Sequence, residues 1–122
     1  MFHYENAWQD VQVRIERAVQ AAGRPAGCVE LLAVSKTFPP ESVRALYGLG
    51  QRAFGENHVQ EAVAKMDALS DLRELEWHLI GPLQSNKTGA AAERFGWVHS
   101  VDRQRIAERL SALRPPEKPP LN

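Results

Sequence analysis

The sequence predicts an α/β fold in which one helix precedes four strand–helix units. Short apolar runs bounded by glycine and proline alternate with segments whose apolar residues recur every three or four positions. Such alternation implies a parallel sheet with right-handed crossovers, either doubly wound or closed as a (β/α)8 barrel. Neither a G-x-G-x-x-G motif nor a P-loop accompanies the strands. The pattern therefore favours a segment of a barrel.

The first helix is predicted over residues 8–22, where apolar residues keep helical spacing. Gly23 and Pro25 then act as a stop signal. The first strand is expected from about Val29 to Ser35. Lys36 follows it directly, just ahead of a Phe-Pro-Pro break, and the carboxyl ends of strands are where α/β folds place their chemistry.

The same alternation predicts the three units that follow. Further strands are expected at residues 53–57, 75–81 and 97–101, and further helices begin near Pro40, Asn57, Ser85 and Asp102. Asn57 is predicted to cap the third helix, with Gln60 in the capping-box position, and Asp102 to cap the last.

Residues 1–122 are expected to form a single, partial barrel domain. Residues 114–122 are rich in proline and read as a connector that would lead into a missing fifth strand. A complete barrel takes about 250 residues and eight strands. Four strands would leave open edges and an uncovered inner face, so the chain is expected to self-associate, to pair with a missing half, or to be unstable.

The composition indicates a protein without a basic surface. Fifteen basic residues balance fifteen acidic ones, which argues against nucleic acid or an anionic membrane as the main partner. The start of the chain lacks the basic and apolar regions of a signal peptide, and no apolar run reaches the length of a membrane span. The single cysteine, Cys28, is interpreted as a small core residue in a reducing compartment. The expected location is the cytoplasm.

Lys36 is the leading candidate for chemistry. Strand alternation places it on one face with Val34 and Leu32. If that face lines a barrel, desolvation of the amine would lower its pKa and favour the neutral nucleophile, which can condense with an aldehyde. The alternative is a lysine that starts a loop and extends into water. The pattern alone favours this alternative.

Asn57 and His78 also fall near strand ends and would approach the same mouth. A helix cap explains Asn57 equally well, and a hydrogen-bonded core histidine explains His78. Glu56 and Glu61 are either paired carboxylates or part of an exposed face. No cluster of histidine, cysteine and carboxylate residues has the spacing of metal ligands, so no metal site is expected.

Three motifs together resemble the pyridoxal phosphate homeostasis protein family (the YggS/PROSC type). They are Leu-Leu-Ala-Val-Ser-Lys-Thr at 31–37, Phe-Gly-Glu-Asn-His-Val-Gln-Glu at 54–61 and Trp-His-Leu-Ile-Gly-Pro-Leu-Gln-Ser-Asn-Lys at 77–87. The resemblance implies the first half of a TIM barrel like the N-terminal domain of alanine racemase, the fold-type III arrangement. It implies that Lys36 binds pyridoxal 5'-phosphate (PLP) as a Schiff base, with Asn57 and His78 around the cofactor.

The resemblance further implies a protein that holds PLP and passes it to PLP-dependent apoenzymes without catalysis. A racemase or decarboxylase using the same lysine is the alternative, disfavoured because no second domain and no candidate tyrosine base are visible. The family's later segments, which hold the phosphate and the pyridine nitrogen, have no counterpart in this sequence. We therefore expect a truncated form with weak cofactor binding. An assembly module with a vestigial site is a further alternative.

Overall fold

The computed structural model describes residues 3–122. Residues 1 and 2, which belong to the segment predicted not to be a signal peptide, lie outside the described range. The predicted order of one helix and four strand–helix units is confirmed. The elements are α1 (Glu5–Ala21), β1 (Ala33–Val34), α2 (Pro40–Leu49), β2 (Ala53–Glu56), α3 (Val59–Ala68), β3 (Glu76–Leu79), the 3-10 helix η1 (Ser85–Lys87), α4 (Thr88–Arg94), β4 (Trp97–Val98) and α5 (Gln104–Leu113).

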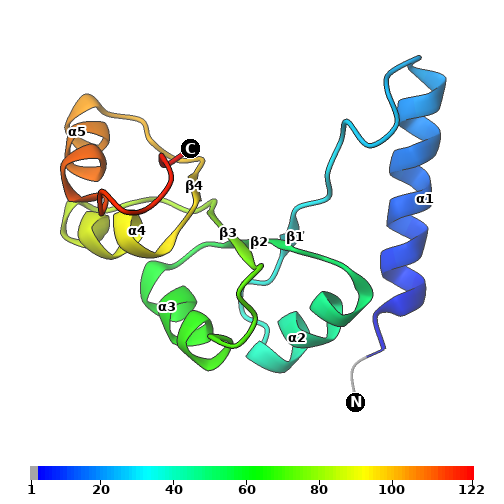
Figure 1. The fold of residues 1–122 in the computed structure, drawn as a ribbon, viewed down its shortest axis with the longest axis horizontal. Helices are drawn as coiled ribbons and strands as arrows, with labels where there is room; N and C mark the ends of the chain where they lie inside the picture. The colour runs from blue at the N-terminus through cyan, green and yellow to red at the C-terminus, as the bar shows by residue number, and fades with distance from the viewer. Residues whose placement is uncertain (1–2) are drawn as a thin grey trace.

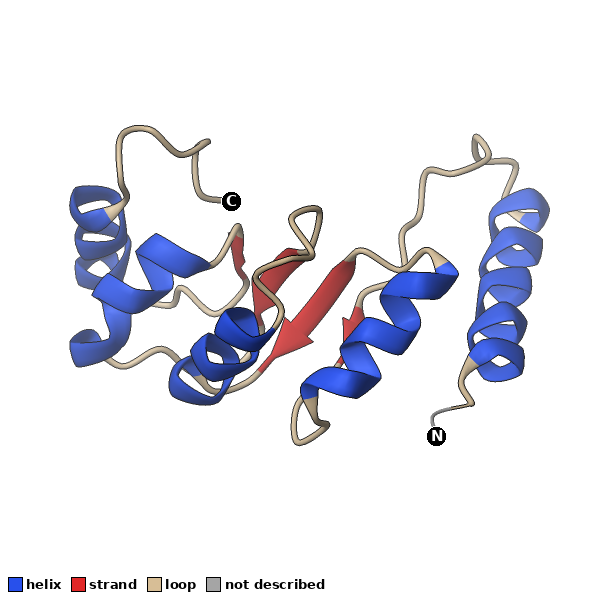
Figure 2. Cartoon of the chain, turned by 60° about the horizontal axis from the view of Figure 1, so that its bottom comes forward, coloured by secondary structure: helices blue, strands red, loops and turns tan. Residues whose placement is uncertain are grey.

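The four strands form one parallel sheet in the order β1-β2-β3-β4. The helices α2 to α5 follow an outer arc, and the strands lie on its inner side, as in four consecutive units of a barrel wall (Figure 1). Figure 2 shows the short strands beside these helices. We call the sheet face that carries Val34, Gly55, His78 and Trp97 the inner face. These four residues are partners in the strand register, so they share one face of the sheet.

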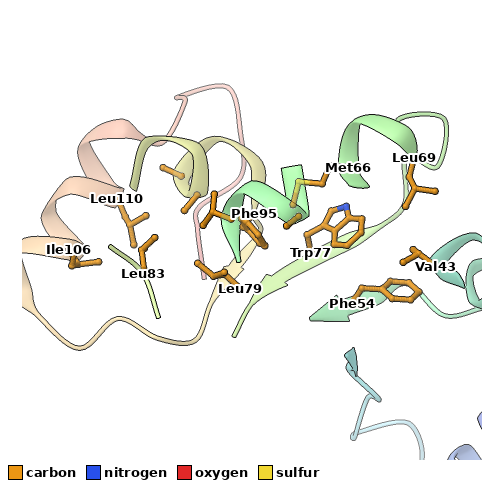
Figure 3. Close-up of a cluster of buried hydrophobic side chains, with 14 residues drawn as sticks. Val43, Phe54, Met66, Leu69, Trp77, Leu79, Leu83, Phe95, Ile106 and Leu110 are labelled. Carbon is orange, nitrogen blue, oxygen red and sulfur yellow. The ribbon is translucent and has the colours of Figure 1, made fainter. Parts of the chain in front are cut away.

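The hydrophobic core lies between the sheet and the outer helices (Figure 3). Strand residues on the face opposite the inner face supply one side of the core, among them Phe54, Trp77 and Leu79. The apolar faces of the helices supply the other side, for example Met66 and Phe95. The rings of Phe54 and Trp77 lie 6.1 Å apart across neighbouring strands. This core is continuous and fixes the orientation of the sheet.

The first strand is shorter than predicted. Of the expected segment from about Val29 to Ser35, only Ala33 and Val34 form a strand. β1 pairs with β2 alone, and β2 begins at Ala53, opposite Leu32, so the residues before Leu32 lie beyond the start of their only partner strand. The prediction that Cys28 is a core residue was wrong, because its thiol is exposed in the segment that leads from α1 to β1.

Both predicted helix caps were wrong by one residue. The N-cap positions of α3 and α5 are His58 and Arg103, and neither makes a side-chain capping bond. Asn57 still continues the direction of β2, because the Ile80 amide donates to the Glu56 carbonyl at 2.9 Å beyond the end of the ladder. The helix can therefore begin only after it.

The last residues of the chain pair with the outer edge of β4. The Asn122 amide donates to the Gly96 carbonyl at 3.1 Å, and the Val98 amide donates to the Asn122 carbonyl at 2.8 Å. These two bonds are those of a parallel strand pair. Arg114 anchors the segment by donating to the carbonyls of Phe95 and Pro119.

An exposed ion pair on the surface links α2 to the segment that follows α3. Arg44 forms a bidentate ion pair with Asp71, and its hydrogen bonds hold the pKa of that carboxyl below its usual range. The pair is exposed. Within residues 3–122, no helix combines the length and apolar character that crossing a bilayer requires.

Candidate functional site

Lys36 lies two residues beyond β1, at the carboxyl edge of the sheet. The Ser35 amide donates to the Gly55 carbonyl at 3.0 Å, which extends the pairing with β2 up to the lysine. The Lys36 side chain is exposed. The expected apolar enclosure of the amine is therefore absent from the part of the chain that the structure describes, whereas the predicted place at the strand end is confirmed.

Lys36 lies in a tight turn. The Phe38 amide donates to the Ser35 carbonyl at 3.1 Å, so Lys36 and Thr37 are its central residues. Thr37 has a φ of 67°, the only positive value for a non-glycine residue among residues 3–122. A β-branched residue in this region costs about 1–3 kcal/mol and persists only when its surroundings hold it. Glu61 contributes to this, because its Oε1 accepts from the Thr37 amide at 3.0 Å.

A buried ion pair lies directly beneath this turn. The Lys65 ammonium donates to the Ser35 carbonyl at 2.6 Å and to both carboxylate oxygens of Glu56, at 2.9 and 3.1 Å. The Ser35 hydroxyl donates to the same carboxylate. Only 6% of the Lys65 side chain and none of the Glu56 side chain is exposed. Glu61 completes the cluster, 3.5 Å from the ammonium.

Sequence reasoning missed Lys65 and left Glu56 undecided. A signal was present. Glu56 lies two residues after Phe54 in β2, so its carboxylate is on the same, core side of the sheet. Lys65 falls between Ala62 and Leu69 on the buried face of α3. An acid and a base at core positions of adjacent elements predict a buried pair, since unpaired burial is costly. The exposed-face interpretation of Glu56 was wrong.

Asn57 lies at the corresponding position on the neighbouring strand. Extending the register of β1, β2 and β3 past their ends puts Lys36, Asn57 and Ile80 on one level. The next residue, Gly81, is buried against the Asn57 backbone, and a Cβ there would lie 2.2 Å from the Asn57 carbonyl oxygen. Glycine is therefore required at position 81 to keep Asn57 beside the end of β3.

Below Lys36 and Asn57, Gly55 contributes no side chain to the inner face, and apolar side chains occupy the space above it. An added Cβ there would lie 3.1 Å from the Ile80 side chain and 3.6 Å from that of Leu32. Leu32 and Ile80 therefore both lie against Gly55, which is one inner-face position below the level of Lys36. This gives the end of the sheet a small apolar floor.

His78 lies deeper in the sheet than Lys36. It is the register partner of Gly55, which in turn faces Val34, so it is two residues below the level of the lysine. Its Nε2 lies 2.7 Å from a Glu76 carboxylate oxygen and its Nδ1 lies 2.9 Å from Nε2 of His99. Its ring stacks on Trp97 with 5.2 Å between centroids. The structure thus brings Asn57 to the level of Lys36 but gives His78 partners of its own.

Bacterial proteins with similar sequences are known. The pyridoxal phosphate homeostasis protein of Pseudomonas aeruginosa is 58% identical over 112 residues, which are 92% of this chain and 48% of that protein. The protein of that name in Escherichia coli K12 is 50% identical over 114 residues, again 92% of this chain and 49% of the relative. The chain is related to the pyridoxal phosphate homeostasis proteins. It spans about half the length of the curated relatives it matches, and no protein-family model matches it.

Solved structures extend this relationship to the fold. PipY of Synechococcus elongatus, with PLP bound, superposes with a TM-score of 0.70 at 50% identity, over 80% of this chain and 46% of PipY. A protein of unknown function from Bifidobacterium adolescentis reaches a TM-score of 0.79 at 36% identity, over 85% of this chain and 46% of its own. Most of this chain therefore shares its fold with about half of PipY, a protein solved with PLP bound.

Proposed function

We propose that this chain binds PLP through Lys36 and serves PLP homeostasis in the cytoplasm without catalysing a reaction. The observation that carries the proposal is the amine itself. Lys36 is exposed at the carboxyl end of β1, and within residues 3–122 it has no hydrogen-bond or ion-pair partner, while the turn that holds it is strained and supported from below. Local strain of this kind is typical of functional sites.

The residues present fit the cofactor. When bound, PLP would supply an aldehyde, with which the Lys36 amine would condense to a Schiff base, releasing water. The Asn57 side chain is a candidate hydrogen-bond partner on the same level of the sheet. Leu32 and Ile80 offer apolar contact beside Gly55. His78 is a candidate neighbour from a deeper position, and its hydrogen bonds to Glu76 and His99 would fix its ring.

Binding by this chain alone is proposed to be weak. Small-molecule sites usually enclose about 70–90% of their ligand. Here the inner face is open: Val34 is 48% exposed and Trp97 is 38% exposed. A ligand on Lys36 would be covered by the sheet on one side only. Residues 114–122 are proposed as the connector that leads onward along the edge of β4, which agrees with the backbone bonds of Asn122.

The proposal predicts that Lys36→Ala abolishes specific cofactor attachment. With PLP added and borohydride used to reduce the imine, the label on the Lys36→Ala chain should fall to about a tenth of the wild-type label or less. Lys118→Ala, at an exposed position of the connector, is the matched control and should keep the label. Equal labelling of the two variants would contradict the proposal. In parallel, racemisation of L-alanine should not exceed that of free PLP, and turnover above that level would favour an enzyme.

Delivery to PLP-dependent apoenzymes is the proposed biological role of the bound cofactor. Its support is the name of the relatives, pyridoxal phosphate homeostasis proteins, which refers to the level of the cofactor and names no reaction. Transfer is expected to require that the lysine–cofactor bond be reversible, and an exposed site permits an incoming acceptor to reach it.

Self-association is a second candidate, favoured by the exposed apolar residues of the inner face and by the unpaired edge of β1. We expect sedimentation equilibrium to give a concentration-dependent mass between one and two chains. Trp97→Glu should shift that equilibrium to the monomer, because a charge on the inner face opposes its burial. The exposed substitution Leu113→Glu on α5 is the control. A wild-type chain that is monomeric at all concentrations would remove this candidate.

A further inference from the structure

The buried cluster beneath Lys36 has no part in the attachment chemistry, yet it contacts the backbone on both sides of the lysine. We propose that Lys65, together with Glu56 and Glu61, is a positioning group that fixes the direction of the Lys36 side chain. The inference rests on the proposed function only for its cofactor readout, because the positioning itself is a property of the chain without PLP.

The contacts of Lys65 converge on the segment that carries Lys36. A lysine ammonium has three N–H donors. They are directed at the Ser35 carbonyl, at 2.6 Å, and at the Glu56 carboxylate, at 2.9 and 3.1 Å. Glu56 in turn accepts from the Ser35 hydroxyl. The residue before Lys36 is therefore held by its carbonyl, by its hydroxyl and, through the Gly55 carbonyl, by its amide.

Glu61 extends the cluster to the residue after Lys36. Its carboxylate lies 3.5 Å from the Lys65 ammonium and accepts from the Thr37 amide at 3.0 Å. The amide of Thr37 can point this way because that residue is in the left-handed region, with φ 67°. A helix α3 that bears both Glu61 and Lys65 thus fixes residues 35 and 37 at once, and leaves the Lys36 amine free.

The charges explain why a buried pair is used here. An apolar pair of similar size would fill the space but would offer no donor to the Ser35 carbonyl and no partner to Glu61. Charged hydrogen bonds are directional and about twice as strong as neutral ones. The cluster therefore specifies one backbone arrangement around Lys36, at the expense of burying two charges.

The test compares the charge-neutral double variant Glu56→Gln/Lys65→Met with Asp67→Asn/Arg94→Met, which removes an exposed ion pair between α3 and α4. The first readout is hydrogen exchange at the Thr37 amide in the chain without PLP. We expect exchange about tenfold faster in Glu56→Gln/Lys65→Met and unchanged in the control. The single variant Lys65→Arg, which keeps the charge and the donors, should retain most of the wild-type protection of the Thr37 amide from exchange.

The second readout is labelling of Lys36. Reductive methylation with formaldehyde, which needs only an exposed amine, should proceed equally in both double variants. Trapping of PLP on Lys36 should fall about tenfold only in Glu56→Gln/Lys65→Met, because an oriented amine raises the effective concentration at the aldehyde. Should that variant fail to fold, Glu61→Ala replaces it, with Gln60→Ala on the exposed side of α3 as control. Its Thr37 exchange should also rise about tenfold.

Each outcome decides one of the two proposals. Faster Thr37 exchange in the cluster variants together with selective loss of PLP trapping supports the positioning role. Unchanged Thr37 exchange overturns it, whatever the cofactor does. Faster exchange with PLP trapping equal to that of the control also overturns it, since the cluster would then stabilise the turn without directing the amine. If the wild-type chain traps no PLP on Lys36, the proposed function fails; unchanged Thr37 exchange then still overturns the positioning role, and faster exchange supports only its first step, that the cluster holds the backbone around Lys36.

Discussion

Replacing Lys65 with methionine is expected to lower the free energy of unfolding by about 3–5 kcal/mol, the usual result of removing one partner of a buried ion pair. Methionine fills much of the same volume, but Glu56, whose side chain has no exposed area, would lose the ammonium group that pairs with its carboxylate. The Ser35 carbonyl would also lose its 2.6 Å donor. Urea denaturation followed by circular dichroism measures the change. Small domains are stable by only about 5–15 kcal/mol, so this loss would be a large part of the total.

Two companion variants separate the charge from the packing. Lys118→Met at the exposed connector should change the stability by no more than about 0.5 kcal/mol. The double variant Glu56→Gln/Lys65→Met should recover most of the loss, since it buries no charge. If Lys65→Met were as stable as Lys118→Met, or if the double variant were less stable than Lys65→Met alone, the buried pair would not have the energetic role described above.

Gly81→Ala is expected to destabilise the chain by about 3 kcal/mol, in the upper part of the range for overpacking. The new methyl group would lie 2.2 Å from the Asn57 carbonyl oxygen and 2.8 Å from the Asn57 Cα, so a backbone segment must move. A displaced Asn57 would no longer share a level with Lys36. We therefore expect weaker trapping of PLP in addition to a lower urea midpoint.

Gly48→Ala is the matched control for this substitution. Gly48 lies in α2, with open space around the position of a Cβ. Alanine is the better helix former, so this variant should gain about 0.5–1 kcal/mol. A Gly81→Ala chain that matches the wild type in stability would show that the ends of β2 and β3 are not in the close contact described here.

The element order could be predicted from the sequence because each unit states its period locally. In β2 and β3, buried apolar residues alternate with residues of the inner face, and in α3 and α5 apolar residues recur at helical spacing. Such patterns depend on a residue's immediate neighbours and on burial of one face. The place of Lys36 followed from the same logic, since an apolar strand interrupted by proline must end near the lysine. Its role, like those of Asn57 and His78, stays a prediction.

What could not be predicted depends on partners distant in the chain. The length of β1 depends on where its partner β2 begins. The pairing of Glu56 with Lys65 depends on the packing of α3 on the sheet. The exposure of Cys28 follows from an arm that connects α1 to the sheet, which no local pattern distinguishes from a strand. The cap predicted at Asn57 failed because Asn57 is held beside Gly81 and not at the helix start.

The central claim, that Lys36 is the point of attachment for PLP, is tested most directly by mapping the reduced adduct in the wild-type chain. The chain has four lysines, and Lys87 and Lys118 serve as internal controls because they too have solvent access. After incubation with a limiting amount of PLP and reduction with borohydride, peptide mass spectrometry should find the pyridoxyl group predominantly on Lys36. A label spread evenly over Lys36, Lys87 and Lys118, or absent from Lys36, would contradict the claim.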